Sequence, residues 1–453
     1  MKRFKAYDTH QSYLLPPSPR EWLPADHLAY FIDNVVDQLD LREVFASYEG
    51  TKGQPPYHPQ MMVKVWLYGY CVGIRSSRKL ERALHEEVGF RMLSGNQQPD
   101  YWTLSEFRRR HLGALRGLFL QTVKLAQRAK LVKLGQVAID GTKLKANASK
   151  HKAMSYTRME KEEKRLGEEI RSYFEEVETT DRSEDERYGS KRGDELPEHL
   201  KTEKERLDVI RKAMAQLEEE ARRKAAAKQQ KRQEKANKEG RSYHPRNDPN
   251  DAKPLPKAQR NFTDPDSRIM KSADKAFIQG YNAQAAVDVD SQIIVAAQLS
   301  NQAADGPHLV GMVEQVEQAT GRRPQEVLAD AGYFSEDNVT TLSEQGMLVL
   351  IPPERVRHRQ WRERCTPPTS PPSKDVSVSE WMRYQLKLPE NKERYRKREQ
   401  SVEPVFGQIK QARGLRQFLL RGLDKVSAMW QLECAAHNIL KLYRAGVPLQ
   451  PTS

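Results

Sequence analysis

The stretch Gln136-Val137-Ala138-Ile139-Asp140-Gly141-Thr142-Lys143-Leu144-Lys145 decides the fold of this chain. A short apolar run closed by Asp-Gly is typical of a buried β-strand whose last side chain emerges into a loop. Asp140 is therefore expected at the carboxyl end of a strand, where open α/β sheets place their reactive groups. The alternative is a simple turn residue, because Asp and Gly dominate turns for conformational reasons.

A second copy of this pattern lies far downstream. Val327-Leu328-Ala329-Asp330 ends in a carboxylate and is followed by Ala331-Gly332-Tyr333. Two strand-end carboxylates so far apart in sequence can meet only through the fold, and a metal ion is a natural reason to bring them together. The two patterns together predict a sheet edge that carries Asp140 and Asp330.

The composition is that of a chain with at least one sizeable hydrophobic core. Of its 453 residues, 37% are apolar and 30% are charged. No apolar run approaches the roughly 18 residues of a membrane helix, and the basic N-terminus lacks the apolar segment of a secretion signal. Cys71, Cys365 and Cys434 are too scattered for a zinc site or a disulfide framework, so a reducing cytoplasm is the expected location.

The net charge of +14 indicates a polyanionic partner such as nucleic acid. Residues 101–150, around Asp140, hold 11 basic and 2 acidic residues, and residues 391–450 hold 12 basic and 5 acidic ones. Residues 151–250 are nearly balanced, with 25 basic and 24 acidic residues, which argues against a mainly phosphate-binding role for that segment. A solvated helix face is the alternative interpretation of either basic stretch.

Residues 1–130 are expected to form a helical domain. Thr103-Leu104-Ser105-Glu106 fits a capping box, which would begin a helix that carries Arg108, Arg109 and Arg110. Clustered arginines on short helices are compatible with the binding of DNA ends by a helix-turn-helix-like unit, and equally with a plain helical bundle.

Residues 151–260 differ in kind from their surroundings. One near-heptad apolar stripe consists of Met159, Leu166, Ile170, Tyr173 and Val177. A second consists of Leu200, Leu207, Ile210, Met214 and Leu217. Two such stripes on charged segments predict a helical hairpin. We expect it to be inserted into a sheet domain made of residues 131–150 and 261–445, with residues 446–453 as a tail.

The sheet is expected to resume after this insertion as a β-hairpin. Residues 280–288 turn at Asp290 and Ser291 into a second apolar run at residues 292–296. Asp288 and Asp290 are expected to shape that turn, although Asp288 could also stand near the two strand-end aspartates. Because a hairpin is antiparallel, the fold class is α/β with a mixed sheet.

The helical segment after residue 391 supplies a candidate third carboxylate, Glu403. Pro404 is tolerated in the first turn of a helix, so Glu403 is expected close to a helix start. Lys410 follows seven residues later and falls on the same helix face. One carboxylate beside one lysine is more often a surface pair than a site.

As a set, these segments resemble the DDE-type transposases of bacterial insertion sequences, in the branch with a Tyr-Arg-Glu-Lys signature. The residues that carry the resemblance are Asp140, Asp330, Tyr395, Arg398, Glu403 and Lys410. The matching blocks lie at residues 68–70, 73–78, 139–143, 263–268, 280–284, 329–333 and 402–407. The resemblance covers nearly the whole chain. It implies a ribonuclease H-like catalytic domain, interrupted by a helical insertion and preceded by an all-α domain.

One spacing departs from the signature of that branch. Four residues separate Arg398 from Glu403, where the signature has three. On a continuous helix the extra residue is expected to turn Arg398 away from the face of the glutamate. Arg396, or a break before Pro404, could compensate.

The resemblance implies metal-dependent chemistry on DNA. Asp140, Asp330 and Glu403 are expected to hold two Mg²⁺ ions, for which Mn²⁺ can substitute, with Asp140 bridging both ions. Carboxylate oxygens suit Mg²⁺, and a pair of such ions activates an oxygen nucleophile and stabilises the leaving oxygen. Contacts to DNA are expected from Lys143, Lys145, Arg108, Arg109, Arg110, Tyr395, Arg398 and Lys410.

The expected function is DNA transposition by a homodimer on DNA. The enzyme would bind the terminal repeats of its element, cleave there and join the 3′-hydroxyl ends to target DNA. The alternatives are a metal-dependent nuclease without strand transfer and a transposase-derived DNA-binding regulator. Three carboxylates that repel phosphate disfavour the regulator.

Overall fold

The computed structural model describes residues 18–48, 55–188, 198–245, 247–272, 274–354, 371–373 and 376–448, without the side chains of residues 173–188 and 198–201. Contacts divide the chain into two compact units. Unit 1 combines Met1–Leu144 with Asn282–Ser453, and unit 2 is Lys145–Tyr281. Cys365 and residues 449–453 of the expected tail lie outside the described residues.

The N-terminal part of unit 1 is helical, as expected. Its elements are η1 (Pro19–Trp22), α1 (Leu28–Asp37), α2 (Arg42–Ala46), α3 (Pro59–Cys71), α4 (Ser77–Glu86), α5 (Val88–Leu93), α6 (Tyr101–Arg110) and α7 (Leu112–Arg128). α6 begins earlier than the sequence predicts. Its N-cap is Asp100, whose side chain accepts a hydrogen bond from the Thr103 amide at 2.6 Å. The capping box expected at residues 103–106 is therefore wrong, because Asp100 already satisfies the first free amides of the helix.

Six strands of the described residues form one mixed sheet. They are β1 (Gln136–Lys145), β4 (Arg268–Lys271), β5 (Phe277–Asp288), β6 (Ile294–Ser300), β7 (Glu326–Ala329) and β8 (Leu348–Leu350). The order is β4-β5-β1-β7-β8, and β6 pairs with β5. β1, β7 and β8 run parallel, whereas β4, β5 and β6 pair antiparallel. The expected mixed α/β sheet, with its hairpin from β5 to β6, is confirmed.

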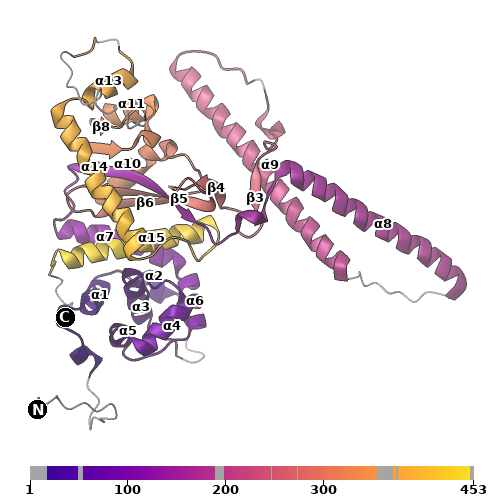
Figure 1. Cartoon of the computed structure of the whole chain (residues 1–453), viewed down its shortest axis with the longest axis horizontal. Coiled ribbons are helices and arrows are strands. Elements are labelled where there is room, and N and C mark those ends of the chain that lie inside the picture. The colour runs from indigo at the N-terminus through magenta and orange to yellow at the C-terminus, as the bar shows by residue number, and fades with distance from the viewer. Residues whose placement is uncertain are drawn as a thin grey trace, which may run out of the picture. The chain divides into compact units, whose positions relative to one another are not determined.

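The last helix of unit 1 joins the sheet to the N-terminal helices. The helices after the sheet strands are α10 (Leu309–Thr320), α11 (Glu336–Glu344), α13 (Val378–Gln385), α14 (Pro389–Gly407) and α15 (Leu423–Arg444). α15 packs against β6 on one side and against α7 and α3 on others (Figure 1). Its Glu433 is fully buried and accepts hydrogen bonds from Arg75 and Arg413, each at 2.7 Å. A buried charge network therefore ties the N-terminal helices to the C-terminal ones.

Unit 2 contains the expected helical hairpin. Its helices are α8 (Tyr156–Tyr188) and α9 (Glu198–Lys238), and its short strands β2 (Ala153–Ser155) and β3 (Gln259–Asn261) pair antiparallel. Members of both predicted stripes form its core, together with Ala213: Met159, Leu166, Leu207, Ile210 and Leu217 are buried. The unit extends on both sides of the expected insertion, because β4 and the first residues of β5 belong to it.

The boundary expected at residues 130 and 131 does not separate compact units, since the N-terminal helices cluster with the sheet in unit 1. The expected domain limits therefore stay a prediction. Among the described helices, none has the length and apolar character needed to cross a membrane.

Candidate active site

The parallel pairing of β1 with β7 brings Asp140 and Asp330 together. Ile139 is opposite Ala329 in the register, and each aspartate is the next residue of its strand or loop. Asp330 starts a short 3₁₀ turn, η5 (Ala331–Tyr333), and its side chain accepts a hydrogen bond from the Gly332 amide at 2.9 Å. The two patterns recognised in the sequence thus meet at one edge of the sheet.

The structure corrects the position of Asp140 within its strand. β1 does not end there but continues to Lys145. Asp140 is nevertheless the first residue of β1 beyond its pairing with β7. The remaining part of β1 stays a strand because β5 lies along its other side, and just beyond β1 the Ala146 amide bonds to the Gln279 carbonyl of β5. Asp140 is therefore anchored in regular backbone rather than in a mobile loop.

Glu403 lies on α14, which Tyr395 fastens to the sheet beside Asp330. The Tyr395 hydroxyl donates a hydrogen bond to the Ala329 carbonyl at 3.2 Å. The prediction that Glu403 stands near a helix start is wrong, because Pro404 lies inside α14. Pro404 has no amide hydrogen to offer the Gln400 carbonyl, and the Gln292 side chain donates to that oxygen instead, at 3.1 Å. A tertiary contact thereby compensates the proline.

Arg398 connects two of the three candidate carboxylates. Its guanidinium is 3.2 Å from an Asp140 oxygen and 3.7 Å from a Glu403 oxygen. Arg398 is buried, whereas 60% of the Glu403 side chain is exposed. The expectation that the longer spacing turns Arg398 away from Glu403 is wrong. The arginine side chain is long and forked, so it reaches both partners although its Cα direction differs.

The environment of Asp140 raises the pKa of its carboxyl group to about 6. Burial is the largest cause, and the carboxylates of Asp330 and Asp305 add to it. The Arg398 guanidinium and the Gly141 amide act in the opposite direction. A cation bound beside these carboxylates would favour the ionised form of Asp140 and so lower the pKa of its carboxyl group.

Asp305 is a fourth carboxylate at this edge, and the sequence-based interpretation missed it. It accepts hydrogen bonds from Lys143, Asn282 and Gln284, each at 2.8 Å. Gln284 in turn accepts a hydrogen bond from the Tyr333 hydroxyl. Asp305 lies between Ala304 and Gly306, which resembles an ordinary turn in the sequence.

Two glycines make room for this network. A Cβ atom on Gly141 would lie 2.8 Å from Asp305 and closer still to the Gln284 side chain. On Gly332 it would lie 3.0 Å from an Asp330 oxygen. Both glycines directly or closely follow a candidate aspartate in the sequence, and that repetition is the signal that could have indicated crowding around the site.

The expected phosphate-binding lysines differ in their surroundings. Lys143 is largely buried and pairs with Asp305. Lys410 lies in a π-helical turn, η7 (Gln408–Ala412), and its ammonium group is 3.1 Å from the Thr142 hydroxyl. Lys145 is exposed and is the first residue of unit 2. Lys410 thus lies beside β1, because its partner Thr142 is two residues after Asp140 on that strand.

The three arginines of α6 do not form one surface cluster. Arg108 is buried, donates to the Arg75 carbonyl at 2.9 Å and stacks over the Trp66 ring at 4.4 Å. This position supports the helical packing and differs from the expected contact with DNA. Arg109 and Arg110 are exposed; Arg109 pairs with Glu106 on the same helix.

Asp288 has hydrogen-bond partners that differ from those of the candidate carboxylates at the sheet edge. One of its oxygens accepts hydrogen bonds from the amides of Lys133 and Leu134, at 3.0 and 2.9 Å. The other accepts from Ser291. Its expected role in the hairpin turn is confirmed, and it also fixes the start of β1.

The donor types at the sheet edge suit a divalent metal ion, since carboxylate oxygens are the ligands that Mg²⁺ prefers. Their arrangement is not that of an assembled metal site. In the described part of the chain, no group of three or more His, Cys, Asp or Glu side chains could hold a metal ion. Arg398 stands instead between Asp140 and Glu403. Ion binding would therefore require these side chains to rearrange around Arg398.

Two protein families match the chain. The family described as "Transposase domain (DUF772)" matches residues 17–110, which include α1 to α6. The family described as "Transposase DDE domain" matches residues 250–439, which include Asp330 and Glu403 but not β1 with Asp140. No curated protein and no solved structure gives a significant match. With the second family match, the mixed sheet and its helices are those of a ribonuclease H-like domain.

Proposed function

We propose that this chain, a transposase with a DDE catalytic domain, cleaves the terminal repeats of its own element and joins the freed 3′-hydroxyl ends to target DNA. As a DDE transposase it is a metal-dependent phosphoryl-transfer enzyme that binds DNA. The observation that carries this proposal is the register of β1 and β7. It aligns Asp140 with Asp330, and Tyr395 and Arg398 attach the helix of Glu403 beside them.

We assign the catalytic carboxylates as Asp140, Asp330 and Glu403. They would hold two divalent ions, Mg²⁺ by preference and Mn²⁺ as a substitute. When bound, such ions activate an oxygen nucleophile and stabilise the negative charge of the leaving oxygen. Before ions bind, Arg398 lies between the Asp140 and Glu403 side chains and offsets their mutual repulsion.

The basic groups around the carboxylates would position DNA. Lys410 lies against Thr142 on β1, where its ammonium group can contact a phosphate near the reacting bond. Lys143 instead holds Asp305 in place behind the site. Tyr395 and Arg398 would orient α14 through their contacts with the Ala329 carbonyl and Asp140.

The test is cleavage of a supercoiled plasmid that carries the element's ends, with and without Mg²⁺. We expect Asp140→Asn, Asp330→Asn and Glu403→Gln each to abolish cleavage while binding of the ends persists. Glu393→Gln is the matched control, because Glu393 is an exposed glutamate on the same helix. Persistent cleavage in any one of the three variants would remove that residue from the assignment.

The same reaction separates transposase from nuclease. Labelled ends should appear covalently joined to target DNA when the wild-type protein is used. Cleaved ends without joined product would favour a metal-dependent nuclease. We further expect the active species to be a homodimer on DNA in the cytoplasm. The mass of the protein–DNA complex tests the homodimer.

A further inference from the structure

The near balance of charge in residues 151–250 conceals a strong segregation along the hairpin. α8 holds 12 acidic and 7 basic residues, and residues 198–221 of α9 hold 7 acidic and 5 basic ones. Residues 222–241, at the end of α9 and just beyond, hold 9 basic and only 2 acidic residues. Both family matches leave residues 111–249 uncovered, so neither assigns a role to this segment.

Five lysines in this segment lie on one face of α9. They are Lys224, Lys228, Lys231, Lys235 and Lys238, which we call the lysine stripe. Their steps of four, three, four and three residues keep them within a band about 80° wide and about 21 Å long on an α-helix. All five side chains are exposed.

Within the described residues, four of the five lysines of the stripe lack ion pairs of the kind found elsewhere in the hairpin. Lys224 pairs with Glu220 at 2.8 Å. Within the described residues, the other four have no carboxylate oxygen within 4.0 Å. In the packed part of the hairpin, by contrast, Arg206 and Arg211 each reach a glutamate of α8, at 2.8 and 2.9 Å.

Packing does not account for the lysine stripe either. The hydrophobic cluster between α8 and α9 ends at Leu217 on α9. Beyond that residue, α9 packs against the segment around η3 (Pro249–Asp251). Ala225 and Gln229 are partly buried there, whereas all five lysines of the stripe are exposed, including Lys228 at the edge of this contact.

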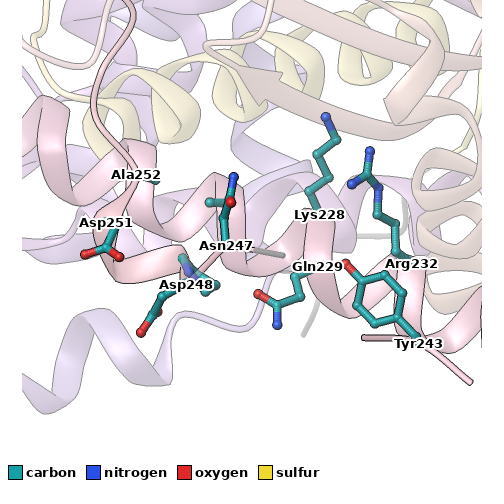
Figure 2. Close-up of a pocket in the computed structure, with 10 residues that line it drawn as sticks. Lys228, Gln229, Arg232, Tyr243, Asn247, Asp248, Asp251 and Ala252 are labelled. Carbon is teal, nitrogen blue, oxygen red and sulfur yellow. The ribbon is translucent and has the colours of Figure 1, made fainter. Parts of the chain in front are cut away.

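A pocket of about 480 Å³ lies beside this part of α9, and its charged lining residues are Lys228, Arg232, Asp248 and Asp251. Figure 2 shows Lys228 and Arg232 extending to the same side of α9, with Tyr243 near Arg232. Asp248 and Asp251 line the opposite end of the pocket in this view. The cationic groups therefore remain grouped on the α9 side.

We propose that the lysine stripe binds the sugar-phosphate backbone of double-stranded DNA without reading its sequence. The proposal rests on the proposed function, because DNA is the substrate of a transposase. Duplex DNA carries one negative charge per roughly 1.7 Å of its axis, and each lysine that contacts it releases condensed counterions. Lysine acts as a point charge without base specificity, in contrast to bidentate arginine contacts with guanine. The lysine stripe thus adds affinity that is independent of the element's ends.

The test measures binding of the full-length protein to a random-sequence DNA duplex by fluorescence anisotropy over a range of salt concentrations. The test variant carries Lys228→Gln, Lys231→Gln, Lys235→Gln and Lys238→Gln, since glutamine preserves helix propensity. The matched control carries Lys161→Gln, Lys164→Gln, Lys204→Gln and Lys212→Gln. These four are also exposed lysines of the hairpin, and the charge change is identical.

We expect the test variant to bind at least tenfold more weakly, with the slope of log affinity against log salt reduced by about 2 to 4. The control should match the wild type within about threefold. Equal binding by test variant and control would overturn the proposal, and so would tighter binding of duplex RNA than of duplex DNA. Cleavage of end-containing plasmid by wild-type protein is scored separately, so the lysine stripe can fail while the proposed function stands.

A second measurement does not depend on the folding of any variant. Lysine acetylation of the wild-type protein, mapped by mass spectrometry, should be slowed by DNA at Lys228, Lys231, Lys235 and Lys238. The same treatment should leave Lys161 and Lys204 unchanged. Equal reactivity with and without DNA at all of these positions would contradict the proposal.

Discussion

The carboxylate edge of the sheet and the lysine stripe of α9 both concentrate charge, but in opposite ways. At the sheet edge, Asp140 is largely buried and its partner Arg398 is 3.2 Å away. On α9, Lys228, Lys231, Lys235 and Lys238 are exposed and lack carboxylate partners within the described residues. A buried charge depends on the identity of each neighbour, whereas an exposed row acts through the sum of its members. Single substitutions should therefore be severe in the first region and nearly silent in the second.

The largest effect should come from the buried network of α15. Glu433→Gln leaves Arg75 and Arg413 buried beside an uncharged partner, and removal of one member of such a network costs about 3–5 kcal/mol. Urea unfolding of the full-length protein measures the change. Glu234→Gln is the control, because Glu234 is exposed on α9, and its cost should stay within about 0.5 kcal/mol. Similar losses for both variants would show that burial does not decide the cost of losing a charge in this protein.

The raised pKa of Asp140 predicts a pH-dependent stability. The folded protein binds a proton up to about pH 6, whereas an unfolded chain releases it near 3.8. Stability should therefore fall as the pH rises from 4 to 7, by at most about 3 kcal/mol from this group. Asp140→Asn removes that dependence. Unfolding of both proteins in EDTA at several pH values measures the difference, and parallel curves would show that Asp140 titrates normally.

Substitution by alanine should destabilise the protein at a crowded glycine and stabilise it at an open glycine within a helix. Gly141→Ala forces a Cβ atom onto the Gln284 and Asp305 side chains, and such overpacking costs about 1–3 kcal/mol. Cleavage activity should fall with it, since Asp140 is the adjacent residue. Gly117→Ala on α7 meets no atom within 4 Å and should stabilise the helix by up to about 1 kcal/mol. Thermal unfolding of the two variants gives the sign of each effect directly.

The smallest effect is expected for a single member of the lysine stripe. Lys235→Gln should change unfolding by less than about 0.5 kcal/mol and reduce the salt slope of DNA binding by about 1. A loss of several kcal/mol would mean that Lys235 has a structural partner. A slope reduced by the full amount of the quadruple variant would show that one lysine, and not the row, carries the binding.

The sequence predicted the parts of the site that depend on local pattern. Short apolar runs ending in Asp located Asp140 and Asp330, and their meeting followed from parallel pairing. Arg398 was misplaced because helix periodicity fixes the direction of Cβ and not the reach of a long side chain. Asp305 was missed because it lies in a loop whereas its partners Asn282 and Gln284 lie on β5, and only tertiary structure brings them to it. Pro404 inside α14 was excluded in error because the donor from Gln292 lies more than a hundred residues away.

The positions of the two ends of unit 2 suggest that the protein can tolerate changes in the length of that unit. Lys145 is the last residue of β1, Tyr281 lies on the neighbouring strand β5, and the Ala146 amide bonds to the Gln279 carbonyl. Both ends of the unit thus lie side by side on adjacent antiparallel strands, the geometry that a two-residue hairpin also closes. Shortening or exchanging the hairpin helices within this unit is therefore expected to leave the order of β5, β1, β7 and β8 unchanged. That junction is therefore the place to exchange the hairpin in engineered versions of this protein.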